Sequence, residues 1–111
     1  MPAILFHITE RTTWETAKAE GNYRAPSLDT EGFIHFSMPE QVLATANRFY
    51  KGKSGLVLLQ VDPSQLLAPL HYEAVADHGT FPHLYGPLNL AAVTKVWPFE
   101  PSLEGHFTLP L

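Results

Sequence analysis

The chain has 111 residues, of which 45% are hydrophobic, and this length suits one domain with one core, which we expect to cover residues 1–111. It has no cysteine, a formal net charge of −4 and only seven basic residues, which excludes disulfides and thiolate metal sites and disfavours binding to bulk nucleic acid. No apolar run approaches the ~20 residues that cross a bilayer, and the first residues lack the pattern of a signal peptide, so we expect a cytoplasmic protein with a small-molecule partner and no membrane contact.

The first third of the chain predicts two buried strands around a short helix. The apolar run Ala3–Ile8 predicts a strand that is buried on both faces. A capping box at Thr12–Glu15 predicts a helix over Thr13–Glu20. An ordered loop over residues 21–30 then leads to a second buried strand at Gly32–Phe36.

A second capping box, Ser37–Glu40, precedes the segment with the clearest helical periodicity. Its apolar residues fall on one stripe and predict a helix over Pro39–Tyr50, with Ser37 interpreted as the N-cap. The stripe consists of Val42, Leu43, Ala46, Phe49 and Tyr50. Leu56–Val61 is the clearest buried strand, and Asp62–Leu67 predicts a helical turn with proline at its first position.

The last third predicts strands separated by irregular segments. Strands are expected at Leu70–Ala76 and Leu88–Trp97, while two prolines and a glycine predict that Phe81–Pro87 is irregular. His106–Leu109 is interpreted as an edge strand. This order of elements predicts an α+β fold with a mixed, strongly bent sheet and two main helices, because the connections are too short for a doubly wound parallel sheet.

Histidines in or beside apolar strands are the main functional signal. Alternation along each strand places two polar side chains on one face. These pairs are His7 with Thr9, His35 with Ser37, and His71 with Glu73. A buried polar group without a partner costs about 1–3 kcal/mol, so several such groups in one core favour contact with one another, with water or with a ligand. We therefore expect His7 and His35 to lie within ~10 Å of each other at one pocket.

Structural interpretations of the same residues remain open at this point. His7 and His35 fit core histidines bonded to the backbone, and Glu73 fits a surface position on a strand. His71, His78 and His106 are expected at the surface. A stiff loop that displays aromatic and imidazole groups suits binding, which favours a site at His83, Tyr85 and Gly86.

Several common site motifs are absent from the sequence. No H-x-H, H-x-x-x-H or H-E-x-x-H spacing is present, so no metal site is predicted, although three histidines with Glu73 leave a metal-dependent hydrolase as a third hypothesis. A nucleophilic-serine elbow, a P-loop and a G-x-G-x-x-G fingerprint are also missing.

The segments FHIT, EGFIHFS and FPHLYG, together with Tyr23, Ser27, Gln41 and the strand LVLLQVD, resemble the small bacterial proteins of domain-of-unknown-function family 952. The resemblance spans about Ile4–Val96. That family is similar in fold to the ADP-ribosyltransferase superfamily, which implies a split, bent sheet with flanking helices. By that resemblance FHIT is similar to the motif whose histidine contacts the adenosine-side ribose of NAD, and GFIHFS is similar to the histidine-and-serine strand of RNA 2′-phosphotransferases.

The resemblance implies a nucleotide-like ligand, with NAD as a candidate ligand or substrate, but two motifs of those enzymes are missing. No Glu-x-Glu pair lies near the last strands, and of the three arginines only Arg24 lies in a loop expected to border the cleft. The predicted ligand-binding residues are His7, Thr9, Tyr23, Arg24, Ser27, Ser37, Tyr85 and Gly86. Tyr23 or Tyr85 is the candidate to stack on a nicotinamide or adenine ring.

Two functions from different classes follow. The first is an enzyme that acts on an NAD-derived or phosphorylated ribosyl ligand, with His35 or His83 as the acid–base group and Glu73 as the carboxylate that stabilises an oxocarbenium-like centre. The second is a non-catalytic domain that binds a small ligand, which the missing glutamate motif favours.

Overall fold

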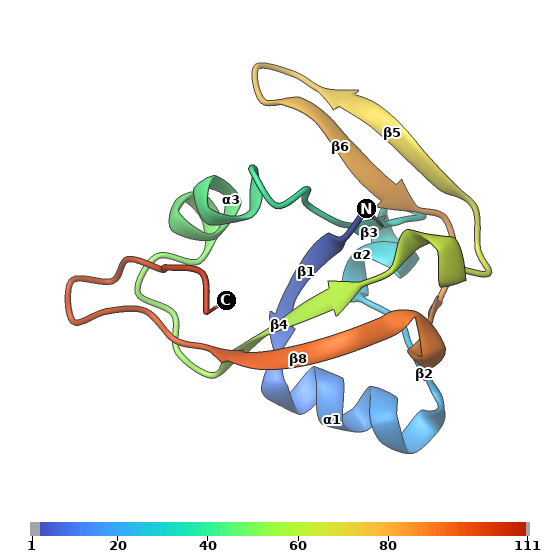
Figure 1. Ribbon diagram of the computed structural model, residues 1–111, viewed down its shortest axis with the longest axis horizontal. Coiled ribbons are helices and arrows are strands. Elements are labelled where there is room, and N and C mark those ends of the chain that lie inside the picture. Colours follow the sequence, from blue (N-terminus) through green and yellow to red (C-terminus); the bar gives the residue numbers. More distant parts are fainter. Residues whose placement is uncertain (1–2, 111) are drawn as a thin grey trace.

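The computed structural model describes residues 3–110 and consists of antiparallel strands with short helices (Figure 1). The first helix follows the first strand directly, and the two longest helices contain ten and eight residues. In chain order the elements are β1 (Leu5–Glu10), α1 (Arg11–Glu20), β2 (Asn22–Tyr23), α2 (Pro26–Thr30), β3 (Ile34–His35), α3 (Val42–Phe49), β4 (Leu56–Val61), the 3-10 turn η1 (Pro63–Gln65), β5 (Leu70–Val75), β6 (Gly79–Leu84), β7 (Leu88–Asn89), the 3-10 turn η2 (Leu90–Ala92) and β8 (Val93–Phe99).

The strands form three ladders, in the orders β1-β4-β8, β3-β6-β5 and β2-β7. Every strand pair among residues 3–110 is antiparallel, so the expectation of a mixed sheet is corrected. The reason lies in the connections. Helix α1 leads from β1 into the β2-β7 ladder, and α3 leads from β3 into the β1-β4-β8 ladder, so neither helix returns the chain to a parallel position in the ladder it left.

The two three-stranded ladders meet at one backbone bridge between Phe6 of β1 and Ser37. The amide of each residue donates to the carbonyl of the other over 2.8 Å. One residue earlier, the amide of Phe36 donates to the carbonyl of Pro82 in β6 over 3.0 Å. The chain therefore passes from the edge of β6 to the edge of β1 within two residues, and the resulting sheet is split and bent at this junction.

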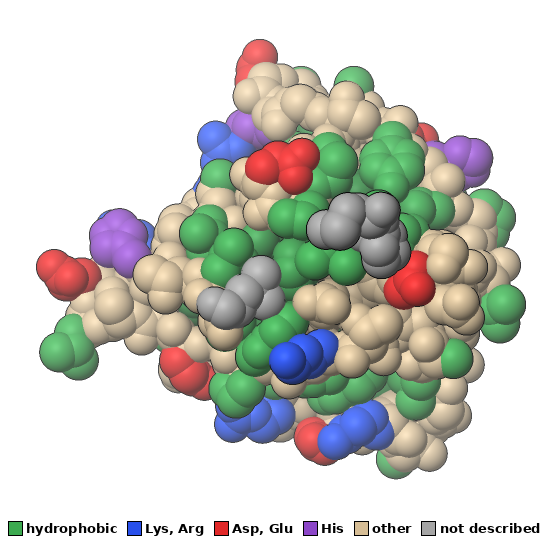
Figure 2. Space-filling model, in the orientation of Figure 1, with side chains coloured by type: hydrophobic (Ala, Val, Ile, Leu, Met, Phe, Trp, Pro, Cys, Tyr) green, Lys and Arg blue, Asp and Glu red, His purple; other side chains and the backbone are tan. Residues whose placement is uncertain are grey.

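Two apolar clusters cover the two faces of the β1-β4-β8 ladder. Alternate residues of β4 enter different clusters: Leu59 packs in the cluster that contains Trp14 of α1, and Leu58 packs in the cluster that contains Val42 of α3. Hydrophobic side chains gather in the middle of the face in Figure 2, and the lysine and arginine side chains on that face are separated from one another. No helix among residues 3–110 is long and apolar enough to span a bilayer.

Neither predicted capping box forms. Helix α1 begins at Arg11, whose amide donates to the carbonyl of Gly55 over 2.9 Å, so a neighbouring turn satisfies the first helical N–H without a side-chain cap. Thr12 lies inside the first turn, where its carbonyl accepts a hydrogen bond from the hydroxyl of Thr16. Ser37 cannot cap α3 because its backbone is used in the bridge to β1, and α3 begins only at Val42.

Three other expectations are corrected. Residues 21–30 are not a loop, since they contain β2 and α2. The expected strand Leu88–Trp97 is divided into β7, η2 and β8, and it continues to Phe99. The segment His106–Leu109 forms no strand, because Phe107 instead stacks on Phe99 with ring centroids 4.7 Å apart.

The segment Phe81–Pro87, which was expected to be irregular, begins inside the strand β6 (Gly79–Leu84). In an antiparallel strand, the N–H and the C=O of one residue point to the same side. That side of Pro82 faces Phe36, which follows the last residue of β3, so the strand tolerates the proline there. Only the carbonyl of Pro82 has a partner there, so the missing N–H removes no hydrogen bond from the ladder.

Candidate functional site

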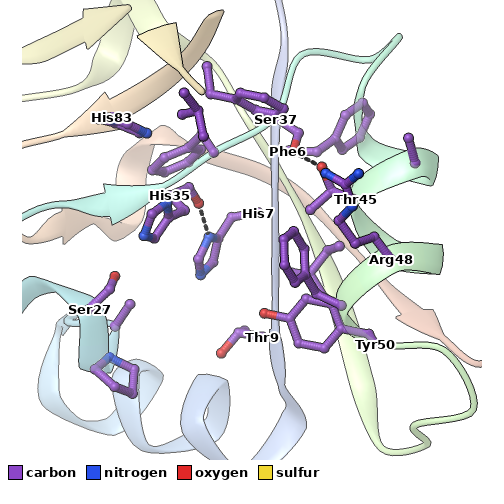
Figure 3. Close-up of a pocket in the computed structure, with 18 of the residues that line it drawn as sticks. Phe6, His7, Thr9, Ser27, His35, Ser37, Thr45, Arg48, Tyr50 and His83 are labelled. Atoms are coloured by element: carbon purple, nitrogen blue, oxygen red, sulfur yellow. Dashed lines mark hydrogen bonds between the residues drawn. The ribbon is translucent and has the colours of Figure 1, made fainter. Parts of the chain in front are cut away.

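A cleft of about 860 Å³ lies along the junction of the two ladders (Figure 3). Its volume is within the range of small-molecule sites. Segments from β1, α2, β3, α3 and the β5–β6 hairpin contribute to its wall. The polar side chains of the wall are His7, Thr9, Glu10, Thr13, Tyr23, Ser27, His35, Ser37, Thr45, Arg48, Tyr50, Lys53, Asp77, His78 and His83.

His7 of β1 is buried in this wall and both of its ring nitrogens have partners. Nδ1 lies 2.6 Å from the carbonyl oxygen of His35, and Nε2 lies 2.7 Å from the hydroxyl of Tyr23. Since a carbonyl only accepts, Nδ1 carries the proton and donates it, and Nε2 of the uncharged ring accepts from Tyr23. The oxygen of Tyr23 lies 2.9 Å from the hydroxyl of Thr9, which is then the donor of that pair.

Burial sets the ionisation of this chain of hydrogen bonds. Loss of solvation lowers the pKa of His7 from 6.5 to about 4, so the ring is uncharged at neutral pH. Burial also raises the pKa of Tyr23 to about 12, so its phenol keeps its proton. Tyr23 is only 1% exposed, and it therefore orients His7 instead of offering a free face for stacking on a ligand ring.

His83 of β6 is also buried, at 5% exposed, but its two nitrogens differ. Nδ1 lies 2.7 Å from a carboxylate oxygen of Glu73, which also accepts from the hydroxyl of Tyr85 over 2.5 Å. The hydrogen bonds from Tyr85 and His83 lower the pKa of Glu73, which keeps it ionised and fixes a proton on Nδ1. Nε2 of His83 is buried and has no hydrogen-bond partner among residues 3–110.

The ring of His83 is held in place by its neighbours. It stacks on Phe33, with centroids 4.2 Å apart and planes at 19°. The ring of His35 lies edge-on to it, with centroids 5.3 Å apart. His35 itself is half exposed, contrary to the expectation of a buried position, because its side chain points outward and Nε2 lies 3.1 Å from Glu31.

Seven of the predicted site residues line the same cleft: His7, Thr9, Tyr23, Ser27, His35, Ser37 and His83. The ring of His7 contacts His35 through the backbone carbonyl of that residue, and both side chains line the cleft. The hydroxyl of Ser27 donates to the carbonyl of Phe33 over 2.8 Å, which ties α2 to the strand that carries His35. Ser37 lies between the ladders, and its hydroxyl donates to Thr45 of α3 over 3.5 Å.

Four predicted site residues lie outside the wall of the cleft: Arg24, Glu73, Tyr85 and Gly86. Arg24 forms an ion pair with Asp29 over 2.9 Å. Glu73 and Tyr85 act on the site through their contacts with each other and with His83. Gly86 lies so close to Ala68 that a Cβ at this position would be 2.6 Å from the Cβ of Ala68, which explains the glycine by packing.

The sequence interpretation missed the wall that α3 and the hairpin supply. Thr45 and Arg48 lie one helical turn apart on α3, and His78 and Asp77 lie at the tip of the β5–β6 hairpin. Nη1 of Arg48 is within hydrogen-bonding distance of both ring nitrogens of His78 and 2.8 Å from Nε2. The spacing of Thr45 and Arg48 on one side of the predicted helix could have indicated this wall from the sequence. The position of the hairpin tip next to α3 could not, because it depends on the tertiary fold. Phe49, assigned to the apolar stripe, is 67% exposed and also lines the cleft.

The residues that the structure describes contain no group of three or more histidine, aspartate or glutamate side chains arranged to hold a metal ion.

Comparisons with known proteins identify the family. Residues 8–96 match the family described as "Protein of unknown function (DUF952)". The chain belongs to this family. A comparison with curated proteins gave no match.

The DUF952 chain is similar to solved structures of protein CC0527 from Caulobacter crescentus. The X-ray structure is 34% identical, covers 96% of this chain and 94% of CC0527, and has a TM-score of 0.87. The solution NMR structure is 35% identical, covers 93% and 90% of the two chains, and has a TM-score of 0.81. The comparisons thus establish the family and a small α+β fold of the CC0527 type.

Proposed function

We propose that this chain binds a nucleotide-like, phosphorylated ribosyl ligand in the histidine-lined cleft. One observation carries the proposal: Nε2 of His83 is buried in the wall and has no partner among residues 3–110, although both nitrogens of His7 in the same wall are satisfied. An orphaned buried nitrogen is costly, so its retention favours a ligand group that completes it.

The surroundings of His83 favour a hydroxylated ligand. Because Nδ1 is paired with Glu73, Nε2 is the ring nitrogen left to form a hydrogen bond with a ligand oxygen, and a hydroxyl can serve as either donor or acceptor there. His35 lies edge-on to this ring and is half exposed, so its displacement gives a ligand access to Nε2. The cleft volume accommodates a nucleotide, and a ribosyl group supplies hydroxyl donors.

The first test compares two histidine variants in a titration with ADP-ribose. His83→Phe keeps the stacking on Phe33 but removes both nitrogens, and we expect it to weaken ADP-ribose binding at least ~10-fold, which corresponds to about 1.4 kcal/mol. The matched control is His71→Phe, since His71 pairs with His83 across the β5–β6 ladder but is exposed and lies outside the cleft. Isothermal titration calorimetry gives both affinities.

Two outcomes would contradict this proposal. Wild-type protein that binds none of ADP-ribose, NAD and ribose 5-phosphate has no site of this class. Equal affinity of wild-type protein and His83→Phe for ADP-ribose removes the role of Nε2, provided that circular dichroism confirms that the variant is folded.

An ADP-ribosyltransferase-like reaction on NAD is the second candidate. The pair of Glu73 and His83 favours it, because a carboxylate that orients an imidazole is a common arrangement for acid–base chemistry. The position of Glu73 outside the wall disfavours it, because cleavage of the nicotinamide–ribose bond needs a carboxylate near the developing positive charge. Incubation with NAD separates the two: nicotinamide release that His83→Phe abolishes supports the enzyme, and binding without release supports the binding domain.

A further inference from the structure

We infer that the α3 end of the cleft is an anion subsite that binds the phosphoryl group of the ligand, with Arg48 as its main contact. This inference rests on the proposed function and names the position of a second part of the ligand. It assigns a role to residues that the sequence alone did not connect with the site.

Arg48 is a cleft-lining cation without a carboxylate partner. Elsewhere in residues 3–110, four basic side chains form ion pairs with carboxylates: Arg11 with Glu100, Lys18 with Glu15, Arg24 with Asp29, and Lys53 with Glu10. Arg48 instead directs Nη1 at the ring of His78. A guanidinium has five N–H donors in a planar fork, so donors remain that match two phosphate oxygens.

Two hydroxyl groups, of Thr45 and Tyr50, line the same end of the cleft as Arg48. Thr45 lies three residues before Arg48 on α3 and therefore on the same side of the helix. The hydroxyl of Ser37 donates to the oxygen of Thr45, which leaves the proton of Thr45 available to a ligand. Burial raises the pKa of Tyr50, so its phenol keeps a proton that it can donate.

Two carboxylates lie at the same end of the cleft as Arg48, and neither forms an ion pair with it among residues 3–110. Glu10 and Asp77 also line the cleft. Nζ of Lys53 lies 3.3 Å from Glu10 and offsets that carboxylate. Asp77 is adjacent in sequence to His78, and no ion pair within residues 3–110 joins Asp77 to Arg48.

The two ends of the cleft differ in chemistry and lie on opposite sides of β1. Figure 3 places Thr45, Arg48 and Tyr50 on the α3 side of this strand and Ser27, His35 and His83 on the other side. The histidine end offers the unpartnered Nε2 of His83 to a sugar hydroxyl, and the α3 end offers donors for an anion. This polarity matches a phosphorylated ribosyl compound that lies across the edge of β1.

The test compares ribose 5-phosphate, ribose and inorganic pyrophosphate in titrations with wild-type protein, Arg48→Gln and Arg11→Gln. Arg11 is the matched control, because it is half exposed, is paired with Glu100 and lies outside the cleft. We expect Arg48→Gln to weaken ribose 5-phosphate binding at least ~10-fold and to leave the weak binding of ribose unchanged. The affinity for ribose 5-phosphate should also depend less on salt concentration in this variant than in wild-type protein. Arg11→Gln should behave as wild type.

The outcomes separate this inference from the proposed function. Equal affinity of Arg48→Gln and wild type for ribose 5-phosphate overturns the subsite, while a dependence on His83 in the same titration keeps the proposed function. Pyrophosphate binding that Arg48→Gln abolishes, without any contribution of ribose or His83, supports the anion subsite and overturns the ribosyl ligand. A loss in Arg11→Gln equal to that in Arg48→Gln also overturns the subsite, because the effect is then one of overall charge.

Discussion

The imidazole of His7 is part of the core and of the cleft wall at the same time. It is only 8% exposed, and its partners come from β2 and from the backbone of β3. The structural interpretation, a satisfied core histidine, and the functional one, a residue that shapes a pocket, therefore describe the same contacts. What distinguishes His83 is its unpartnered Nε2.

His7 should make the stability of the protein fall in acid. Its pKa is about 4 in the folded protein and 6.5 in the unfolded chain, so the unfolded chain binds the proton more readily between these values. The stabilisation is fully present above pH 6.5 and is lost as the pH falls toward 4, by up to about 3 kcal/mol. Urea denaturation at several pH values gives this slope for wild type and His7→Gln.

The two proteins are compared by how steeply the free energy of unfolding changes with pH, and not by its value. The value itself is lower in His7→Gln at every pH, because this substitution also removes two hydrogen bonds. We expect a shallower loss of unfolding free energy in His7→Gln between pH 6.5 and 4. The exposed His106→Gln serves as a control that keeps the wild-type slope. Parallel curves for wild type and His7→Gln would refute the burial effect.

At the scale of elements, close backbone packing explains a residue that the sequence assigned to ligand binding. Gly86 follows β6 and lies against Ala68, which precedes β5, so this contact fixes how the hairpin leaves the sheet. The amide of Tyr85 also donates to the carbonyl of Pro69 over 2.8 Å at the same place.

Gly86→Ala should destabilise the fold by about 1–3 kcal/mol, because its new Cβ would lie 2.6 Å from a rigid Cβ of Ala68. The double variant Ala68→Gly/Gly86→Ala removes the clash and should recover part of this loss. The single variant Ala68→Gly is the control for the cost of the added glycine, about 0.5–1 kcal/mol. Thermal unfolding monitored by circular dichroism gives all three values, and additive effects of the two substitutions would contradict the clash.

Elements with a strong local pattern were predictable from the sequence. The strand Leu56–Val61 has the predicted bounds, and α1 differs from its prediction by two residues at its start. The elements that were missed depend on tertiary partners. β6 contains a proline that is acceptable only because β3 ends beside it, and the N-terminus of α1 is satisfied by a turn more than forty residues later in the chain, at Gly55.

The candidate site was predictable on one side only. Strand alternation indicated that His7, His35 and Ser37 would meet, because residues on one face of neighbouring strands share surroundings. The contact between Arg48 and His78 follows from the path of the β5–β6 hairpin over α3, which no local pattern specifies. For the same reason Glu73 was placed in the cleft by its strand position, whereas it lies behind His83.

At the scale of the whole molecule, the cleft follows the one place where two ladders are joined by a single backbone bridge. A ligand there contacts residues of both ladders and of α3. Its binding energy would therefore stabilise the junction, where two backbone hydrogen bonds join Phe6 and Ser37, against opening.

Saturation with ADP-ribose should protect amides on both sides of the junction from hydrogen exchange. We expect the largest slowing of exchange at residues 34–37, at residues 79–84 and in α3, and a smaller effect in β8, which lies outside the cleft. At 100 times the dissociation constant, the free energy of unfolding should rise by ~2.7 kcal/mol. Hydrogen-exchange mass spectrometry measures the protection, and protection confined to one ladder would argue against a ligand that crosses the edge of β1.

The pairing of β1 with β4 also bears on how the chain acquires its fold. Leu5 pairs with Val61 and Glu10 pairs with Leu56, so β1 pairs with a strand that lies more than forty residues later in the chain. The β5–β6 hairpin, in contrast, pairs strands that are joined by a short turn, and such a hairpin can form before distant parts of the chain meet. Closure of this long connection costs more chain entropy than closure of the hairpin, so we expect β1 to dock on β4 after the hairpin has formed. Until then the apolar residues of β1 stay exposed to aggregation.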